Sequence, residues 1–467
     1  MKESIYNIYI NDKDDNNIHF IYNAFRNTLI SDDNNKIKTF ISECKGNVKP
    51  DPKYITKEEF EALVSTGILV PNEIDEKQLV IDRNRKRLEI LNNKCDHLSL
   101  VIAPTLRCNF KCFYCFESTN IRKDERIISS GVQNDIIDFI TNSIIEQPIK
   151  TIGIIWYGGE PLIQQNTIFS MQQKINDICE LHNVKRNLQI VTNGLLLTPK
   201  ICDQLCKLGI KSVQITIDGP EHIHNKRRFY AENPTNNYST ILNNILLSNE
   251  NVKIMIRINV DRMNKEFIYE LIDDLIEKKI WPYKKNVSIY TAHVDYASKT
   301  DLSKDEYAIL EDEIRYYLMK RYNEIKQTSK AKLNFLYPQL GGGILCGYGV
   351  SKNSWVVNYN GDVYRCWESV GKKEHKVGTI KDLLKDSGQS IFEKIKIDNK
   401  SFDKWGCFEC KYFPICSTTC PWDYLENSRN RKCTEWKILL DYRIINQYKL
   451  FLDHPDIYAN IPFKVDK

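Results

Sequence analysis

The chain of 467 residues has no long apolar run, no strong excess of one charge and no basic stripe broken by aromatics. A membrane-spanning helix needs roughly 20 apolar residues, so we expect no membrane association. The segment Met1–Asn11 lacks the basic region, apolar stretch and cleavage site of a secretory signal, which predicts a cytoplasmic protein. The net charge of +5 is small for this length, and Lys alternates with Asp and Glu. Nucleic acid is therefore not expected as a partner.

Cysteine, by contrast, is abundant. The chain has 15 cysteines, and in a reducing cytoplasm clustered thiols indicate metal or redox chemistry rather than disulfides. Most of them fall into two spaced groups, from Cys108 to Cys115 and from Cys346 to Cys433. The remaining ones are expected to be small buried hydrophobic residues; these are Cys44, Cys95, Cys179, Cys202 and Cys206.

The length predicts two or three domains, and residues 1–94 are expected to form a small one. Its predicted elements are a hairpin with a turn rich in Asp and Asn, a helix capped by Thr56, two short strands and a charged helix. In order they cover Ile5–Ile10 and Ile18–Tyr22, Thr56 to Gly67, Ile68–Val70, Leu79–Ile81 and Asp82–Leu91. A hairpin, short helices and a wing-like strand suit binding more than catalysis.

Residues 95–300 alternate between strand and helix patterns. The predicted strands are Leu98–Ala103, Thr151–Trp156, Leu188–Thr192, Ser212–Ile217, Lys253–Val260 and Asn286–Thr291. The predicted helices are Ile127–Ile145, Thr167–Leu181, Pro199–Leu208, Thr240–Ser248 and Lys265–Lys278. This α/β alternation predicts a parallel sheet, open or curled into a partial barrel, with ligands at the carboxyl ends of the strands. We further expect a helical connector over 301–340, a region rich in Cys, Gly and aromatics over 341–435, and a helix with a tail over 436–467.

The first cysteine group follows the first predicted strand. Cys108, Cys112 and Cys115 stand on one tight loop with three and then two residues between them. Three thiolates hold three corners of a 4Fe–4S cluster, and the fourth iron then stays open to a small chelating molecule. A structural zinc site is the alternative, but it needs a fourth ligand, and only His97 lies nearby in the sequence.

This C-x3-C-x2-C loop, with an aromatic before the third Cys, resembles the signature of the radical S-adenosylmethionine (SAM) superfamily. Four later stretches match its motifs in order, each at a predicted strand end or on the fifth strand. They are Tyr157–Pro161, Thr192–Gly194, Asp218–Pro220 with His224–Arg228, and Arg257–Asp261. Asn225 stands where the family usually has Asp. The resemblance implies a partial (β/α)6 TIM-type barrel and reductive cleavage of SAM to methionine and a 5′-deoxyadenosyl radical, which abstracts hydrogen from a C–H bond.

The resemblance also implies which residues bind SAM. The turn of Gly158, Gly159, Glu160 and Pro161 would receive the methionine amino group, and Thr192 and Asn193 would contact the same ligand. Arg228 is the first candidate for the ligand carboxylate and Arg227 the second. Asn259 would face the nucleoside, and Asp218 belongs to the same SAM-binding set.

The second cysteine group consists of Cys346, Cys366, Cys407, Cys410, Cys416, Cys420 and Cys433. Their spacing resembles the seven-cysteine pattern of the SPASM domain, a C-terminal iron–sulfur extension of radical enzymes that modify peptides and proteins. The resemblance implies two auxiliary 4Fe–4S clusters, and thus three clusters in all. The distal one would be held by Cys407, Cys410, Cys416 and Cys433, and the proximal one by Cys346, Cys366 and Cys420. The proximal cluster lacks an eighth cysteine, so a different group fills that corner or the iron is open to substrate. Paired zinc ribbons are the alternative.

Three functions remain open for the whole chain. The first is a maturase that cross-links or otherwise modifies a short ribosomal precursor peptide, whose leader the N-terminal winged-helix-like domain would grip, with a flavodoxin or ferredoxin as reductant. The second is an anaerobic sulfatase-maturing enzyme, although Trp367 stands where those relatives carry an Asp base. The third is an iron–sulfur electron-transfer or binding protein without radical chemistry. We expect the first, with Glu368 and Tyr364 as candidate proton handlers.

Overall fold

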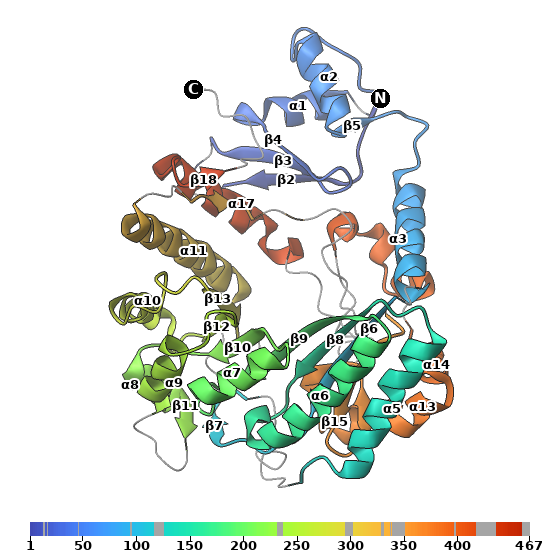
Figure 1. The fold of residues 1–467 in the computed structure, drawn as a ribbon. Coiled ribbons are helices and arrows are strands. Elements are labelled where there is room, and N and C mark those ends of the chain that lie inside the picture. The colour runs from blue at the N-terminus through green and yellow to red at the C-terminus, as the bar shows by residue number, and fades with distance from the viewer. Residues whose placement is uncertain are drawn as a thin grey trace.

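A computed structural model shows the fold of this chain (Figure 1). It describes residues 1–12, 15, 17–44, 46–93, 96–115, 126–230, 237–294, 302–327, 331–336, 338, 351–396, 398–416 and 436–459. Within these ranges no helix combines the length and apolarity needed to cross a membrane.

A curved parallel sheet forms the centre of the molecule. Its strands are β6 (His97–Ala103), β8 (Thr151–Trp156), β9 (Lys185–Thr192), β10 (Ser212–Thr216), β12 (Lys253–Val260) and β13 (Val287–His293). Each pairs in parallel with the next along the chain, so all carboxyl ends meet at one edge. The predicted strands and their parallel order are confirmed.

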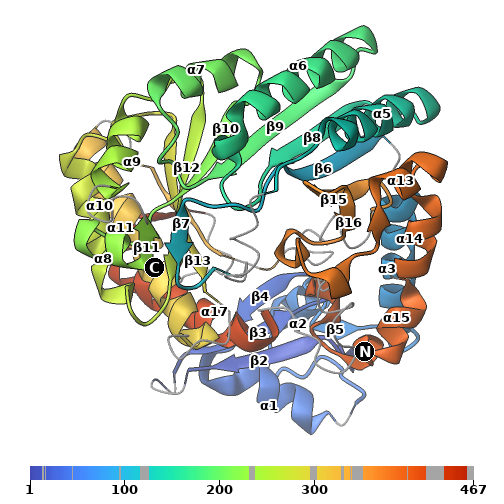
Figure 2. The ribbon, with the colours of Figure 1, turned by 90° about the horizontal axis from the view of Figure 1, so that it is seen from below.

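Helices cover the convex side of this sheet (Figure 2). They are α5 (Ser130–Glu146), α6 (Gln165–Leu181), α7 (Pro199–Lys207), α9 (Asn237–Leu246) and α10 (Ile268–Glu277), each within a few residues of its prediction. Along β8, buried residues alternate with half-buried ones, because one face packs on these helices and the other faces the hollow of the barrel. Cys179 and Cys202 are buried in this helix layer, as expected of structural cysteines.

Strands from far along the chain extend the sheet beyond β6. The parallel strand β15 (Ser354–Asn358) pairs with β6, and the antiparallel strands β16 (Asp362–Tyr364) and β17 (Gly378–Thr379) follow it. The resulting nine-stranded sheet carries Cys366 directly after β16. The predicted cysteine-rich region therefore shares a sheet with the barrel.

The N-terminal residues form a three-stranded antiparallel sheet of β2 (Asn7–Asn11), β3 (His19–Asn23) and β4 (Thr28–Ser31). One face packs against α1 (Lys36–Glu43) and α2 (Lys57–Ser65), and Thr56 caps α2 with a complete capping box, as predicted. β1 (Lys2–Glu3) pairs with β5 (Leu69–Val70). The expected strand at 79–81 is wrong, because α3 runs as one helix over Glu76–Asn93. The winged-helix-like description stays a prediction.

The C-terminal helix α17 (Trp436–Asp453) lies between the N-terminal sheet and α11 (Lys304–Lys326) (Figure 1). The Phe20 ring meets Tyr448 edge-on at 5.1 Å, and Lys449 pairs with Asp12 at 2.6 Å. A shared apolar cluster therefore joins the first and last parts of the chain.

The remaining short elements lie around these cores. The strands are β7 (Phe110–Cys112), β11 (Arg228–Tyr230), β14 (Leu333–Asn334) and β18 (Tyr458–Ala459). The helices are α8 (Glu221–Arg227), α13 (Ile380–Asp386), α14 (Gln389–Ile395) and α15 (Asn399–Lys404). The 3-10 helices are η1 (Asp33–Asn35), η2 (Pro161–Gln164), η3 (Lys265–Phe267), η4 (Trp367–Ser369), η5 (Lys373–His375), η6 (Cys407–Glu409) and η7 (Phe413–Ile415).

Candidate active site

A cavity of about 240 Å³ opens at the carboxyl edge of the parallel sheet. Many of the residues predicted to bind a cluster or SAM line it: Cys108, Cys112, Cys115, Gly158, Gly159, Thr192, Asn193, Arg228, Asn259 and Glu368. Others among the predicted SAM contacts and proton handlers do not line it: Glu160, Pro161, Asp218 and Tyr364. Residues that are distant in the sequence thus meet because parallel strands end together.

A short ribbon fixes the loop that carries the three cysteines. β7 pairs antiparallel with β11, and the register places Cys112 opposite Arg228. The backbone N–H of Phe110 donates to Cys108 Sγ at 3.4 Å, and Phe110 itself is buried. The cysteine loop is therefore held by pairing with the segment after α8, in addition to its connection to β6.

The two glycines after β8 sit tightly against this loop. A Cβ at Gly158 would lie 2.2 Å from the carbonyl oxygen of Thr105, and one at Gly159 would lie 2.4 Å from that of Arg107. Gly158 also has a φ of +118°, which residues other than glycine rarely adopt. Glycine at these two positions therefore lets the turn pack directly against the backbone of the cysteine loop.

Glu160 organises the next strand end rather than lining the cavity. Its buried carboxylate accepts hydrogen bonds from Leu162 N at 3.0 Å, Thr192 Oγ1 at 2.8 Å and Asn193 N at 2.7 Å. Burial raises the pKa of Glu160, and these hydrogen bonds oppose the rise. Glu160 therefore ties two of the predicted SAM-binding turns together.

The two adjacent arginines after α8 have different surroundings. Arg227 donates to both carboxylate oxygens of Asp261, at 2.8 and 3.0 Å, and its Nε lies 3.6 Å from Asp218. All three of these side chains are buried. Arg228 instead lines the cavity and donates to the Tyr114 hydroxyl at 2.5 Å. Of the two candidates for a ligand carboxylate, only Arg228 faces the cavity.

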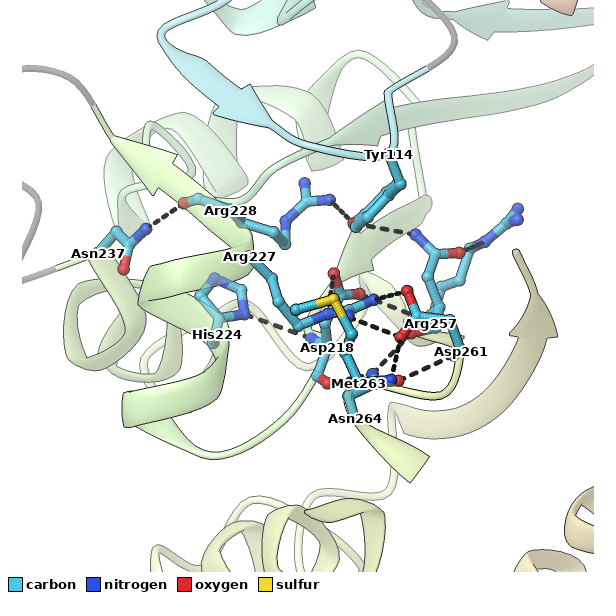
Figure 3. Close-up of polar contacts among 11 residues, drawn as sticks. Tyr114, Asp218, His224, Arg227, Arg228, Asn237, Arg257, Asp261, Met263 and Asn264 are labelled. Atoms are coloured by element: carbon cyan, nitrogen blue, oxygen red, sulfur yellow. Dashed lines mark hydrogen bonds and ion pairs between the residues drawn. The ribbon is translucent and has the colours of Figure 1, made fainter. Parts of the chain in front are cut away.

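Tyr114 connects two other residues that line the cavity, and Figure 3 shows the side chain of Arg228 pointing toward its hydroxyl. Its hydroxyl accepts from Arg228 and from Asn259 Nδ2 at 3.1 Å, and Asn259 Oδ1 accepts from Arg257 Nε at 2.8 Å. Burial raises the pKa of the Tyr114 phenol well above its ordinary value, so the hydroxyl is neutral. The network sets the positions of Arg228 and Asn259, the two side chains predicted to contact opposite ends of SAM.

The segment after Cys366 reaches the same cavity. Trp367 stacks on Tyr157 at 5.5 Å, and both line the cavity with Glu368. Tyr364 is buried away from the cavity, with its hydroxyl 3.4 Å from Asn358 Nδ2, and burial raises its pKa to about 12. Of the two candidate proton handlers, Glu368 alone is placed at the cavity.

The three thiols at one cavity match the soft donor set of an iron–sulfur cluster. Within the described part of the chain, no three His, Cys, Asp or Glu side chains are grouped so as to hold a metal ion. The fit to a cluster therefore rests on the donor chemistry, on the shared cavity and on the open space beside the thiols.

The second cysteine group is described only in part. Cys407, Cys410 and Cys416 belong to the η6–η7 stretch and to the apolar cluster shared with the N-terminal sheet. Cys366 stands at the start of η4. The other predicted ligands, Cys346, Cys420 and Cys433, lie outside the described residues.

Several cavity residues were not assigned a role from the sequence: Tyr114, Tyr157, Gln214, Thr216, Arg257, His293 and Trp367. Gln214 and Thr216, like Arg257 and Asn259, stand two residues apart on a strand and so share a face. The alternation of side chains along each strand, applied at its carboxyl end, is therefore the sequence signal that identifies these residues.

Comparison with known proteins identifies a family model that matches the barrel region. Residues 102–291 match a family model described as the radical SAM superfamily. The chain is 24% identical over 243 residues to the radical SAM cyclopropyl synthase TigE of Paramaledivibacter caminithermalis, covering 48% of this chain and 50% of that protein. It also covers 58% of an uncharacterized protein of Methanocaldococcus jannaschii, at 31% identity over 38% of this chain. The chain thus spans half the length of the first relative and 58% of the second.

A different relative is covered almost completely. The cysteine-type anaerobic sulfatase-maturating enzyme of Clostridium perfringens is 24% identical over an alignment of 384 residues, which covers 75% of this chain and 98% of that enzyme. A solved structure described as native anSMEcpe with bound AdoMet has a TM-score of 0.56 at 18% identity, covering 76% of this chain and 98% of that one. This structural likeness shows a common fold.

Proposed function

Because residues 102–291 form a radical SAM domain, we propose that this protein cleaves SAM reductively and modifies a peptide or protein by hydrogen abstraction. The observation that carries the proposal is the single cavity in which the three cysteines face Arg228 and Asn259. A 4Fe–4S cluster with SAM supplies, when bound, the one-electron chemistry that yields a 5′-deoxyadenosyl radical.

The chain's own residues would bind and orient these groups. Cys108, Cys112 and Cys115 hold three corners of the cluster, and the Gly158–Gly159 turn keeps their loop in place. Arg228 binds the SAM carboxylate, and its contact with Tyr114 fixes the direction of its guanidinium. Asn259 binds the nucleoside end, while Trp367 and Tyr157 shield one wall from water.

We further propose that the chain holds two auxiliary clusters. The distal one takes Cys407, Cys410, Cys416 and Cys433, and the proximal one takes Cys346, Cys366 and Cys420. Support for the proximal cluster comes from Cys366, which precedes two residues that line the main cavity. Glu368 is then the group that takes or gives a proton beside the substrate.

The finer substrate proposal is a ribosomal precursor peptide in which a side-chain cross-link is formed. Relatives described as a cyclopropyl synthase and as sulfatase-maturating enzymes support the general chemistry. The long alignment covers 98% of the sulfatase-maturating enzyme but only 75% of this chain, which leaves room for an additional unit. We assign residues 1–94 to binding of the leader, and a flavodoxin or ferredoxin to delivery of the electron.

The radical step is tested by 5′-deoxyadenosine formation from SAM under anaerobic reduction with dithionite. Wild type should form it, and Cys112→Ala should not. Cys206→Ala, a half-buried thiol on α7 away from the cavity, is the matched control and should behave as wild type. Turnover by Cys112→Ala would contradict the ligand assignment.

A second candidate function is formylglycine formation in a sulfatase, which the near-complete coverage of the Clostridium perfringens enzyme favours. Trp367 disfavours it, because an indole cannot accept a proton at the position after Cys366. The neighbouring reading frames separate the two, since a short peptide gene favours the first function and a sulfatase gene the second, and co-expression with the encoded product tests either one. A cross-linked peptide loses the mass of a pair of hydrogen atoms per link, whereas a formylglycine-containing protein reacts with a hydrazide probe.

A further inference from the structure

A second cavity of about 410 Å³ adjoins the active-site cavity. We call it the α11–α17 chamber, since those two helices supply most of its wall. It is lined by His293, Tyr307, Glu311, Leu336, Trp436 and Arg443, with Ala292 at its base.

His293 belongs to both cavities and stands at their junction. Its Nε2 lies 3.0 Å from the carbonyl oxygen of Leu302, and its ring stacks on Tyr307 at 4.9 Å. The Tyr307 hydroxyl donates to Thr291 Oγ1 at 3.1 Å on β13. His293 therefore stands between the two spaces at the carboxyl end of the last barrel strand, with its ring stacked on Tyr307.

The charges around the chamber are paired with one another. Arg443 contacts Glu311 and lies 3.4 Å from Asp312, whose buried carboxylate is also 3.6 Å from Arg315. The Arg443 guanidinium additionally lies 5.9 Å from the Trp436 ring. The chamber consequently combines aromatic and apolar surface from Tyr307, Trp436 and Leu336 with the charges of Arg443 and Glu311, which pair with each other.

The chamber is built outside the shared domain. All the described residues that line it follow position 291, where the radical SAM match ends. Residues inside that match surround the thiols and the predicted SAM contacts. The substrate is what differs between enzymes that share this domain. A space that adjoins the reaction cavity, with walls from residues outside the domain, is therefore suited to binding the substrate.

We propose that the α11–α17 chamber binds an apolar or aromatic side chain of the peptide substrate, beside the residue that loses hydrogen. His293 separates that bound side chain from the reacting one. The proposal rests on the proposed function and adds the chemical class of the substrate segment. Leu336, Tyr307 and Trp436 are its specificity-determining residues, since a pocket of this kind gains free energy from apolar area buried.

The first test uses a photoreactive side chain in the chamber. The full-length protein carries p-benzoyl-phenylalanine at position 436 and is illuminated with an mRNA-displayed library of random linear peptides. The matched control carries it at position 448, a half-buried aromatic site on the same helix whose native ring faces Phe20 of the N-terminal sheet. Capture at 436 should enrich peptides with an apolar or aromatic residue at one position, and capture at 448 should not. Equal capture at both sites, or enrichment of charged residues at 436, would overturn the proposal.

The second test measures affinity for the captured peptides. Leu336→Asp places a carboxylate in the chamber while Gln447 still holds the Leu336 backbone, with hydrogen bonds of 2.6 and 3.0 Å. It should weaken binding about tenfold or more, whereas Tyr448→Ala should not. Trp436→Ala should shift the preference toward larger side chains, which a merely structural role would not do.

Different measurements test the proposed function and the assignment of the α11–α17 chamber. SAM cleavage without peptide, driven by dithionite, reports only the proposed function and should be unchanged in Leu336→Asp. If wild type forms no 5′-deoxyadenosine, the proposed function is wrong. If it forms 5′-deoxyadenosine but Leu336→Asp binds the captured peptides as well as wild type does, only the chamber assignment is wrong.

Discussion

Arg227 and Arg228 are neighbours in sequence, yet the fold gives them different tasks. Arg227 is buried in an ion pair with Asp261, whereas Arg228 lines the cavity. Removing one member of a buried pair leaves the other charge uncompensated, which costs about 3–5 kcal/mol. The same change at a ligand-facing arginine costs affinity instead of stability.

We therefore expect Arg228→Gln to weaken SAM binding about 10- to 100-fold, as measured by equilibrium titration of the reconstituted protein. Arg228→Lys should recover part of the affinity, because it restores the charge without the planar fork. Arg227→Gln should instead lower the thermal unfolding midpoint. A loss of SAM affinity in Arg227→Gln with an unchanged midpoint would reverse the assignment.

Gly159→Ala gives a second prediction at this scale. The added methyl group would lie 2.4 Å from the carbonyl oxygens of Leu106 and Arg107, so the loop before Cys108 must shift. We expect the variant to fold but to lose about four irons from the first cluster, assayed by iron content and by its electron paramagnetic resonance spectrum. Gly131→Ala, where a Cβ would meet nothing nearer than Ser129 Oγ at 3.9 Å, controls for the loss of a glycine in general. Full iron content in Gly159→Ala would show that the close approach is not needed.

At the scale of elements, the packing of α11 on α17 buries the carboxylate of Asp312 beside Arg443. Burial raises the pKa of Asp312 from 3.8 to about 6, against the opposing effect of Arg443 and Arg315. A carboxyl group with a raised folded-state pKa binds more protons when folded than when unfolded. Its contribution to stability is therefore largest at low pH and falls as the pH rises from about 4 to 6.

Asp312→Asn cannot ionise and should lack this dependence. The wild-type unfolding midpoint should therefore decrease relative to that of Asp312→Asn as the pH rises from about 4 to 6. The difference corresponds to at most about 3 kcal/mol, at 1.36 kcal/mol per pKa unit. Differential scanning calorimetry of both proteins at matched pH values measures it. A difference that rises with pH would mean that the arginines outweigh burial.

For the whole molecule, the number of clusters is the decisive quantity. Reconstituted protein should bind about twelve irons per chain, as expected for three cubane clusters. The double variant Cys407→Ala, Cys410→Ala should bind about eight and keep the first cluster. A wild-type count near four, unchanged in the double variant, would leave only the cluster at Cys108, Cys112 and Cys115.

Apolar contacts and strand pairing connect the predicted domains to one another. The N-terminal sheet shares an apolar cluster with α17 and with the stretch from Cys407 to Cys416, and β15 extends the barrel sheet next to β6. The sequence boundaries at 94 and 340 were drawn from changes in pattern along the chain. Strand pairing and shared burial across these positions leave no such pattern, because they depend on contacts between distant segments.

The sequence by itself determined the parallel strands, the cysteine loop and the motifs at the strand ends, because strand periodicity and ligand spacing are local properties. Only the tertiary structure decided which arginine faces the cavity, since that depends on the register of β7 against β11. It also decided that the glycine turn contacts the cysteine loop, and that residues 79–81 are helical. The α11–α17 chamber belongs to the same group, because its walls come from segments more than 100 residues apart, such as Ala292 and Arg443.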